Sequence, residues 1–371
     1  MKDKLTPITL AFVAGLCLLS ISGTALAVTY QLIDMGTLGG RSSSGSGINN
    51  NGQVAGQSNN WINKSRAFVT DAAGNLINLG TLGGYESGSM GINSRGQVTG
   101  WSRTSGGSTH AFVTDTAGYM TDLGTLGGNY AIGSGINDIG EITGYSDTLS
   151  GEAHAFVRDV AGNMNDLGTL GGARSYGSDI NNIGQVVGSS DTSSGERHAF
   201  VTDAVGNMTD LGTLGGTRSN GSGINNVGHV TGDSLTSSGE NHAFVTDAAG
   251  NMTDLGTLGG TISLGFDIND SGHVVGMSFN SVGNDEAFLF DGFQMIGLCA
   301  LVDCAVAGWD NLRYAHAIND LGSITGYGTT VTGQTHAFLL QASPVPVPAA
   351  VWLFGSALLG MIGYSKRKHT T

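Results

Sequence analysis

The pentapeptide Gly36-Thr37-Leu38-Gly39-Gly40 sets the pattern of the whole chain, because the same five residues recur every 44 residues. The later copies carry their threonines at Thr81, Thr125, Thr169, Thr213 and Thr257. A period of this size with strand-like sequence is typical of solenoids and propellers. The sequence therefore predicts a repeat protein.

Two further motifs recur with the same period and give the number of units. The isoleucines of an Ile-Asn pair lie at Ile48, Ile92, Ile136, Ile180, Ile224, Ile268 and Ile318, and only the last step is longer, at 50 residues. The phenylalanines of an Ala-Phe pair lie at Phe68, Phe112, Phe156, Phe200, Phe244, Phe288 and Phe338. The sequence thus contains seven units, with six extra residues before the last.

Each unit contains four short β-prone runs, which in one unit cover residues 87–93, 97–102, 110–115 and 119–124. Short Gly- and Asn-containing connections between them favour antiparallel hairpins. The pentapeptide is interpreted as the connection from the outer strand of one sheet to the inner strand of the next. Its Leu is expected to pack between sheets, and its glycines allow backbone conformations closed to other residues.

The predicted fold is an all-β, seven-bladed β-propeller of 44-residue, four-stranded repeats over residues 28–341. The last unit stops after residues 336–340 and lacks a fourth strand, whereas the chain begins with a matching strand at residues 29–35. Pairing of the two closes the ring and covers two strand edges. An open β-solenoid is the alternative, and it does not need such complementary ends.

Composition excludes several classes of protein. Of 371 residues, 63 are Gly, 12% are charged and 39% are hydrophobic, which argues against a charged disordered chain and against a multi-span membrane protein. Without its two terminal segments the chain keeps 10 basic and 28 acidic residues, a net charge near −18. Such a surface repels phosphates, so we expect no nucleic acid partner.

Residues 1–27 are interpreted as a secretory signal peptide. Lys2 and Lys4 precede an apolar run over residues 8–19, and Ala25 and Ala27 fit a small-residue cleavage site. The mature chain is expected to start near Val28.

Residues 342–371 form a second terminal segment. Three prolines precede residues 349–364, which carry no charge, and Lys366, Arg367 and Lys368 follow. As a helix, 16 residues cover about 24 Å, slightly less than a hydrocarbon core of roughly 30 Å. The basic end is expected to stay cytoplasmic. A permanent single-pass anchor is one interpretation of this short transmembrane segment.

The order Val345-Pro346-Val347-Pro348-Ala349, apolar run and basic end resembles the PEP-CTERM sorting signal of Gram-negative bacteria. Val347 stands where the commonest form of that signal has Glu. The resemblance implies export, a transient stage in the inner membrane, and processing near the prolines by a membrane enzyme called exosortase.

Residues 30–340 resemble the HAF repeat family of extracellular bacterial proteins. The His-Ala-Phe triplet that names this family stands here at His110, His154, His198, His242 and His336, whereas Arg66 and Glu286 replace the histidine in two units. The resemblance implies an extracellular location and a repeat architecture, and it assigns no biochemical activity.

The repeated histidines and aspartates are predicted to be structural. Each histidine belongs to a different blade, too far from the others to share a Zn²⁺, and could hydrogen-bond a loop residue such as Asp115 or Asp122. Aspartates that open Gly-rich turns usually accept backbone N–H bonds, as expected for Asp34, Asp122, Asp166, Asp210 and Asp254. Weak Ca²⁺ binding is the alternative, although this series lacks the dense acidic spacing of a calcium loop. No cofactor or metal is expected.

The irregular segment Leu298–Leu312 replaces one blade connection and is the candidate for a one-off function. No catalytic motif is present elsewhere. Cys299 and Cys304 are predicted to form a disulfide, because an exported protein meets an oxidising compartment. Trp309 either packs over a blade gap or provides a stacking platform for a sugar, and with Asp310 it is the candidate ligand-binding pair.

These features predict an exported, non-enzymatic component of the cell surface or the exopolysaccharide matrix, with a structural or ligand-binding role. One alternative is a lectin for the matrix polysaccharide, for which Trp61, Trp101 and Tyr145 would recur at one loop. The other is a hydrolase or lyase acting on that polysaccharide. It requires acids clustered at the channel mouth, and the sequence does not place them.

Overall fold

The computed structural model describes residues 28–344, which fold into β-strands and one short 3-10 helix, η1 (Leu298–Ala300). The first strands of the successive units are β2 (Gly39–Ile48), β6 (Gly83–Ile92), β10 (Gly127–Ile136), β14 (Gly171–Ile180), β18 (Gly215–Ile224), β22 (Gly259–Ile268) and β26 (Trp309–Ile318). The second strands are β3 (Val54–Asn60), β7 (Val98–Thr104), β11 (Ile142–Thr148), β15 (Val186–Thr192), β19 (Val230–Thr236), β23 (Val274–Asn280) and β27 (Ile324–Thr330).

The outer strands of each unit are shorter. The third strands are β4 (Ser65–Thr70), β8 (Thr109–Thr114), β12 (Ala153–Arg158), β16 (Arg197–Thr202), β20 (Asn241–Thr246), β24 (Asp285–Phe290) and the longer β28 (Thr335–Pro344). The fourth strands are β5 (Leu76–Asn78), β9 (Met120–Asp122), β13 (Met164–Asp166), β17 (Met208–Asp210), β21 (Met252–Asp254) and β25 (Met295–Gly297), to which β1 (Val28–Asp34) is added at the start of the chain.

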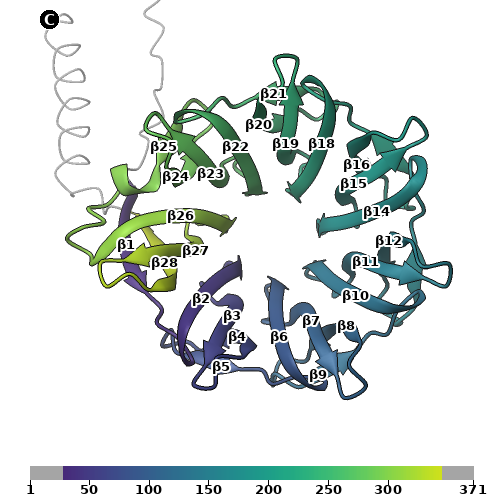
Figure 1. Ribbon diagram of the computed structural model, residues 1–371, viewed down its shortest axis with the longest axis horizontal. Helices are drawn as coiled ribbons and strands as arrows, with labels where there is room; N and C mark the ends of the chain where they lie inside the picture. The colour runs from purple at the N-terminus through teal and green to yellow at the C-terminus, as the bar shows by residue number, and fades with distance from the viewer. Residues whose placement is uncertain (1–27, 345–371) are drawn as a thin grey trace, which may run out of the picture. The chain divides into compact units, whose positions relative to one another are not determined.

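Pairing within a unit is antiparallel and follows the order of the chain, as in β14 with β15, β15 with β16, and β16 with β17. Four pairs of neighbouring units are also joined by a single parallel bridge, for example Arg197 with Arg218, so that the described strands form three sheets. Figure 1 shows the units following one another around a central axis, with the ends of the first strands innermost. The architecture is therefore all-β and propeller-like.

Strand β1 pairs with β28, the third strand of the last unit. The pairing continues in a hydrogen bond of 3.1 Å from the Met35 N–H to the Ala337 carbonyl. The predicted partnership between the start of the chain and its last unit is thus present.

The hydrophobic core is divided into clusters that lie between adjacent units. The phenylalanine of every Ala-Phe pair is fully buried. Phe156, for example, packs with Ile136 and Ile142 of its own unit and with Ala111 and Leu126 from the chain before them. Burying a Phe side chain stabilises a fold by roughly 1.5–3 kcal/mol, so these clusters hold neighbouring sheets together.

The pentapeptide differs in one respect from the predicted connection, because its last two glycines already belong to the first strand of the next unit. Its leucines lie in the clusters between units, as predicted. Gly39 has φ of +95°, and a Cβ on Gly40 would lie 2.5 Å from the Asn59 carbonyl oxygen. Positive φ and close strand contact therefore explain why both positions are glycine.

Several predictions for the chain ends lie outside the described residues. They are the signal peptide over residues 1–27 with its cleavage residues Ala25 and Ala27, the sorting residues 345–349, the segment 349–364, and Lys366, Arg367 and Lys368. Within residues 28–344, no helix is long and apolar enough to span a membrane.

Candidate functional site

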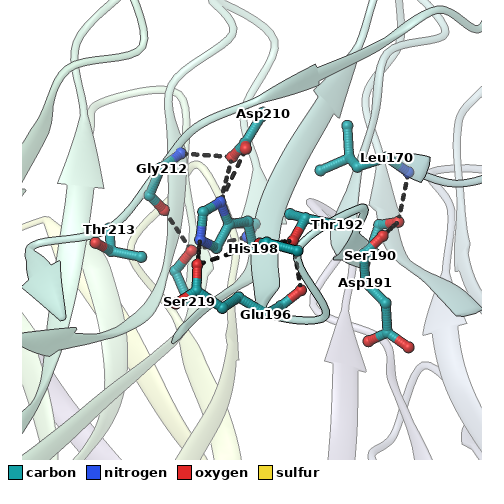
Figure 2. Close-up of polar contacts among 12 residues, drawn as sticks. Leu170, Ser190, Asp191, Thr192, Glu196, His198, Asp210, Gly212, Thr213 and Ser219 are labelled. Carbon is teal, nitrogen blue, oxygen red and sulfur yellow. Dashed lines mark hydrogen bonds and ion pairs between the residues drawn. The ribbon is translucent and has the colours of Figure 1, made fainter. Parts of the chain in front are cut away.

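The repeated histidines form ion pairs or hydrogen bonds with the aspartate of the neighbouring strand. His198 Nδ1 lies 2.8 Å from Asp210 Oδ2, and Asp210 also accepts the Gly212 N–H at 2.8 Å (Figure 2). Equivalent pairs are His110–Asp122, His154–Asp166, His242–Asp254 and His336–Asp34. The predicted hydrogen bonds of both series are thus present, with Asp122 rather than Asp115 as the partner of His110.

The pair is replaced as a whole where the histidine is absent. In the first unit Asn78, which pairs with Phe68, stands at the position of the aspartate, and the Arg66 guanidinium donates to the Tyr85 carbonyl. Glu286 faces Gly297, where a Cβ would collide with the Glu286 carboxylate. The pairing is used in five units and exchanged in two, and in the five it links two neighbouring strands. Among the residues described, no three His, Cys, Asp or Glu side chains form a metal-binding group.

The asparagines of the Ile-Asn pairs form a continuous circuit of hydrogen bonds. The Nδ2 of Asn49 donates to the Asn93 carbonyl at 3.0 Å, and each following asparagine donates to the next carbonyl until Asn319 donates back to Asn49. The Oδ1 of the same residue accepts N–H groups of its own turn, as Asn181 does from Ile183 and Gln185. One buried amide therefore shapes the turn and also joins two units.

The irregular segment around η1 contains the predicted disulfide between Cys299 and Cys304. Trp309 is only 1% exposed and packs edge-on against Phe338, with ring centroids 6.2 Å apart. Of the two interpretations of Trp309, burial supports packing and contradicts an exposed stacking platform. Asp310 is exposed beside the same loop, and its role in ligand binding stays a prediction.

The three aromatic residues considered for a lectin do not recur at one loop. Trp101 and Tyr145 occupy equivalent positions within strands β7 and β11, whereas Trp61 lies in the loop after β3 and is 82% exposed. Tyr145 packs against Tyr130 and Tyr176. That prediction was wrong because Trp61 stands four positions further along its unit than the other two.

A cavity of about 370 Å³ lies where the first strands converge, and its lining breaks the regularity of the repeat. Three of the seven units have Ser-Gly before the Ile-Asn pair, as at Ser46 and Gly47. The exceptions are Met90, Asp179, Phe266, Asp267, and His316 with Ala317. The side chains that differ between units therefore meet in one place.

Asp179 and Asp267 lie deep among protein atoms while reaching the cavity. Asp179 accepts the N–H groups of Ile180 and Ile224 at 2.8 and 3.2 Å. Asp267 accepts those of Ile268 and Ile318, both at 2.8 Å. Desolvation by burial raises the pKa of both carboxyls, and the charge of Asp179 raises the pKa of Asp267 further.

His316 and Phe266 complete this part of the lining. His316 Nδ1 lies 2.8 Å from the Gly45 carbonyl oxygen, and burial lowers the pKa of its imidazole. Phe266 stacks on Tyr314, with ring centroids 5.9 Å apart, and Tyr314 stacks on Tyr327 at 4.9 Å. The cavity thus combines two protonatable carboxyls, a neutral imidazole and an aromatic wall.

Sequence analysis missed this site, although a signal was present. Asp179 and Asp267 replace the Gly or Ala that precedes Ile-Asn in the other five units. Each substitution places a carboxyl at a position where other units have almost no side chain. The cavity lining departs from the repeat in the identity of its residues. The sequence prediction instead placed a site at residues 298–312, where the repeat is longer.

The raised pKa of Asp267 predicts that folding stability depends on pH. Between about pH 4 and its raised pKa the folded chain binds a proton that the unfolded chain has lost, so stability falls as pH rises through this range. Asp267→Asn removes this titration, and we expect it to raise the melting temperature at pH 8 more than at pH 5. Thermal melting at both values checks this, with Asp147→Asn as a control on strand β11. A greater gain at pH 5 contradicts the prediction.

No protein-family model matches the sequence, and no curated protein matches it. Solved structures do resemble the fold. The β-propeller domain of the Trilobed protease from Pyrococcus furiosus superposes with a TM-score of 0.53 at 9% identity, covering 82% of this chain and 98% of that one. A puromycin hydrolase gives a TM-score of 0.53 at 13% identity, covering 85% of this chain and 56% of that one. At these identities the likeness supports a propeller scaffold and says nothing of activity.

Proposed function

We propose that this chain is an exported, non-enzymatic protein of the cell surface or exopolysaccharide matrix of a Gram-negative bacterium, built on a closed seven-bladed propeller. The observation that carries the closed ring is the circuit of asparagine hydrogen bonds. Asn269 donates to the Asn319 carbonyl, and Asn319 donates to the Asn49 carbonyl of the first unit, so the circuit has no end. The pairing of β1 with β28 agrees with a ring closed by the first strand. The repeated polar groups serve as structural links and leave the molecule as a scaffold.

Export is supported by the two terminal sequence signals. The N-terminal 27 residues have the order of a signal peptide, and the C-terminal tail resembles the PEP-CTERM signal. The protein would use the export machinery, pass through the inner membrane and be processed by an exosortase. The disulfide between Cys299 and Cys304 agrees with an oxidising compartment.

A lectin is the second candidate, and the cavity lined by Asp179, Asp267 and Phe266 favours it. A hydrolase or lyase acting on the matrix polysaccharide is the third. A binding screen against the host exopolysaccharide, with the polymer length followed in the same samples, separates the three. A pure scaffold leaves the polymer unbound and intact, a lectin binds it, and an enzyme shortens it.

Replacing Pro346 and Pro348 by Ala tests the sorting tail. Exosortase processing depends on the proline-containing motif, so we expect the double variant to remain in the inner membrane, with at least a tenfold loss from the surface. Cell fractionation and the mass of the released protein measure this. Pro344→Ala, just before the motif, is the control. Normal release of the double variant at the processed mass contradicts the sorting signal.

A further inference from the structure

The hydrogen-bonding groups of the irregular cavity lining are mainly acceptors. A backbone carbonyl only accepts hydrogen bonds, so His316 Nδ1 carries the proton that it donates to Gly45 O. The neutral imidazole then has a lone pair on Nε2. Among residues 28–344, the hydrogen bonds of this ring involve Nδ1 alone. Asp179 and Asp267, when ionised, add only acceptors. A ligand that fits this lining must therefore donate hydrogen bonds.

The two carboxyls of this lining have no cationic partner. None of the Lys or Arg ion pairs in the described part of the chain includes Asp179 or Asp267. The charged groups that act on Asp267 are Asp179 and Asp320, and both are acidic. Burying carboxyls without a cation costs stability, and such an arrangement is common at functional sites. A positively charged ligand would offset this cost.

The aromatic side chains of the lining indicate which kind of cation would bind. Phe266 borders the cavity together with His316, and their rings meet edge to face with centroids 5.6 Å apart. Aromatic faces attract ammonium groups and pack against rings. A volume of about 370 Å³ is near the lower end of the roughly 300–1,000 Å³ of small-molecule sites, which favours one ring rather than a long chain segment.

We propose that this cavity binds a primary ammonium group carried on a six-membered ring, as in an amino sugar. The ammonium donates to the carboxylates of Asp179 and Asp267, a hydroxyl of the ring donates to His316 Nε2, and the ring packs against Phe266. A carboxyl that is protonated in the free protein gives its proton to solvent when the cation binds, so binding releases protons. The inference extends the lectin candidate of the proposed function to a ligand class, but binding itself does not depend on export.

A divalent metal ion fits these residues less well. Each of the four carboxylate oxygens accepts one backbone N–H and keeps a lone pair for a further hydrogen bond. The residues described hold no group of three His, Cys, Asp or Glu side chains able to ligate a metal. An ammonium group needs only hydrogen bonds and charge, both of which the lining supplies.

Titration calorimetry of the purified protein with glucosamine at pH 6.5 tests the proposal, with N-acetylglucosamine as the neutral probe of similar shape. We expect glucosamine to bind at least tenfold more tightly. Titrations in two buffers of different ionisation enthalpy should show net release of protons. Equal affinity for both sugars, no binding of glucosamine, or binding without proton release would overturn the proposal.

Variants locate the binding. Asp267→Asn and Asp179→Asn should each weaken glucosamine binding at least tenfold and reduce proton release, while Asp147→Asn, a half-buried position of β11 outside the cavity lining, should leave both unchanged. Thermal melting shows whether each variant is folded. If one aspartate variant does not fold, the other still tests the proposal. Glucosamine binding that is unchanged in both Asp179→Asn and Asp267→Asn contradicts the proposal. Failed export of the full chain contradicts only the proposed location.

Discussion

Deletion of residues 28–35 from the full chain is expected to lower the melting temperature by more than 10 °C or to cause aggregation. The deletion removes strand β1, exposes the edge of β28, and takes away Tyr30 and Leu32, which pack on the cluster around Trp309 and Phe338. Two lost apolar side chains and the strand pairing amount to at least about 5 kcal/mol, and each kcal/mol shifts the melting temperature by roughly 2–4 °C in a large domain.

Asp34→Asn is the control for this deletion. It weakens only the contact with His336, in which the Asp34 side chain is 43% exposed, so we expect a change below about 1 kcal/mol. Thermal melting and light scattering of both variants give the comparison. A deletion variant that melts like the parent would show that β1 does not complete the last unit.

Replacement of Asn181 by Ala is expected to destabilise the fold by about 3 kcal/mol. Asn181 is 4% exposed, and its side chain bonds the Asn225 carbonyl and the N–H groups of Ile183 and Gln185. The substitution leaves these backbone groups without their partner, and each unsatisfied buried group costs about 1–3 kcal/mol. Chemical denaturation measures the loss.

Asn165→Ala provides a matched control, because Asn165 is an exposed asparagine of β13 in the preceding unit. We expect its effect to stay within about 0.5 kcal/mol. If the two variants lose the same stability, the circuit of asparagines is not a source of stability, and the main support for the closed ring is removed.

The sequence by itself determined the repeat, the strands and much of the local hydrogen bonding. The period of 44 residues places a strand wherever β-prone residues alternate with turn residues, and these contacts form between neighbours in the chain. The contact of His110 with Asp122 joins adjacent strands of one unit, so it was within reach of the sequence. Even the pairing of β1 with β28 could be inferred, because a missing strand is visible in the repeat.

Only the tertiary structure decided where the irregular side chains meet and which of them are buried. Asp179, Asp267 and His316 come from three different units, and they line one cavity because the first strands converge on the central axis. Trp309 is covered by packing against Phe338, a contact set by how the last units fit together. The alternation of residues along a strand determines the face on which each side chain lies. Which side chains are buried, and which meet at the central axis, depends instead on how whole sheets are placed. That placement results from the many contacts between sheets.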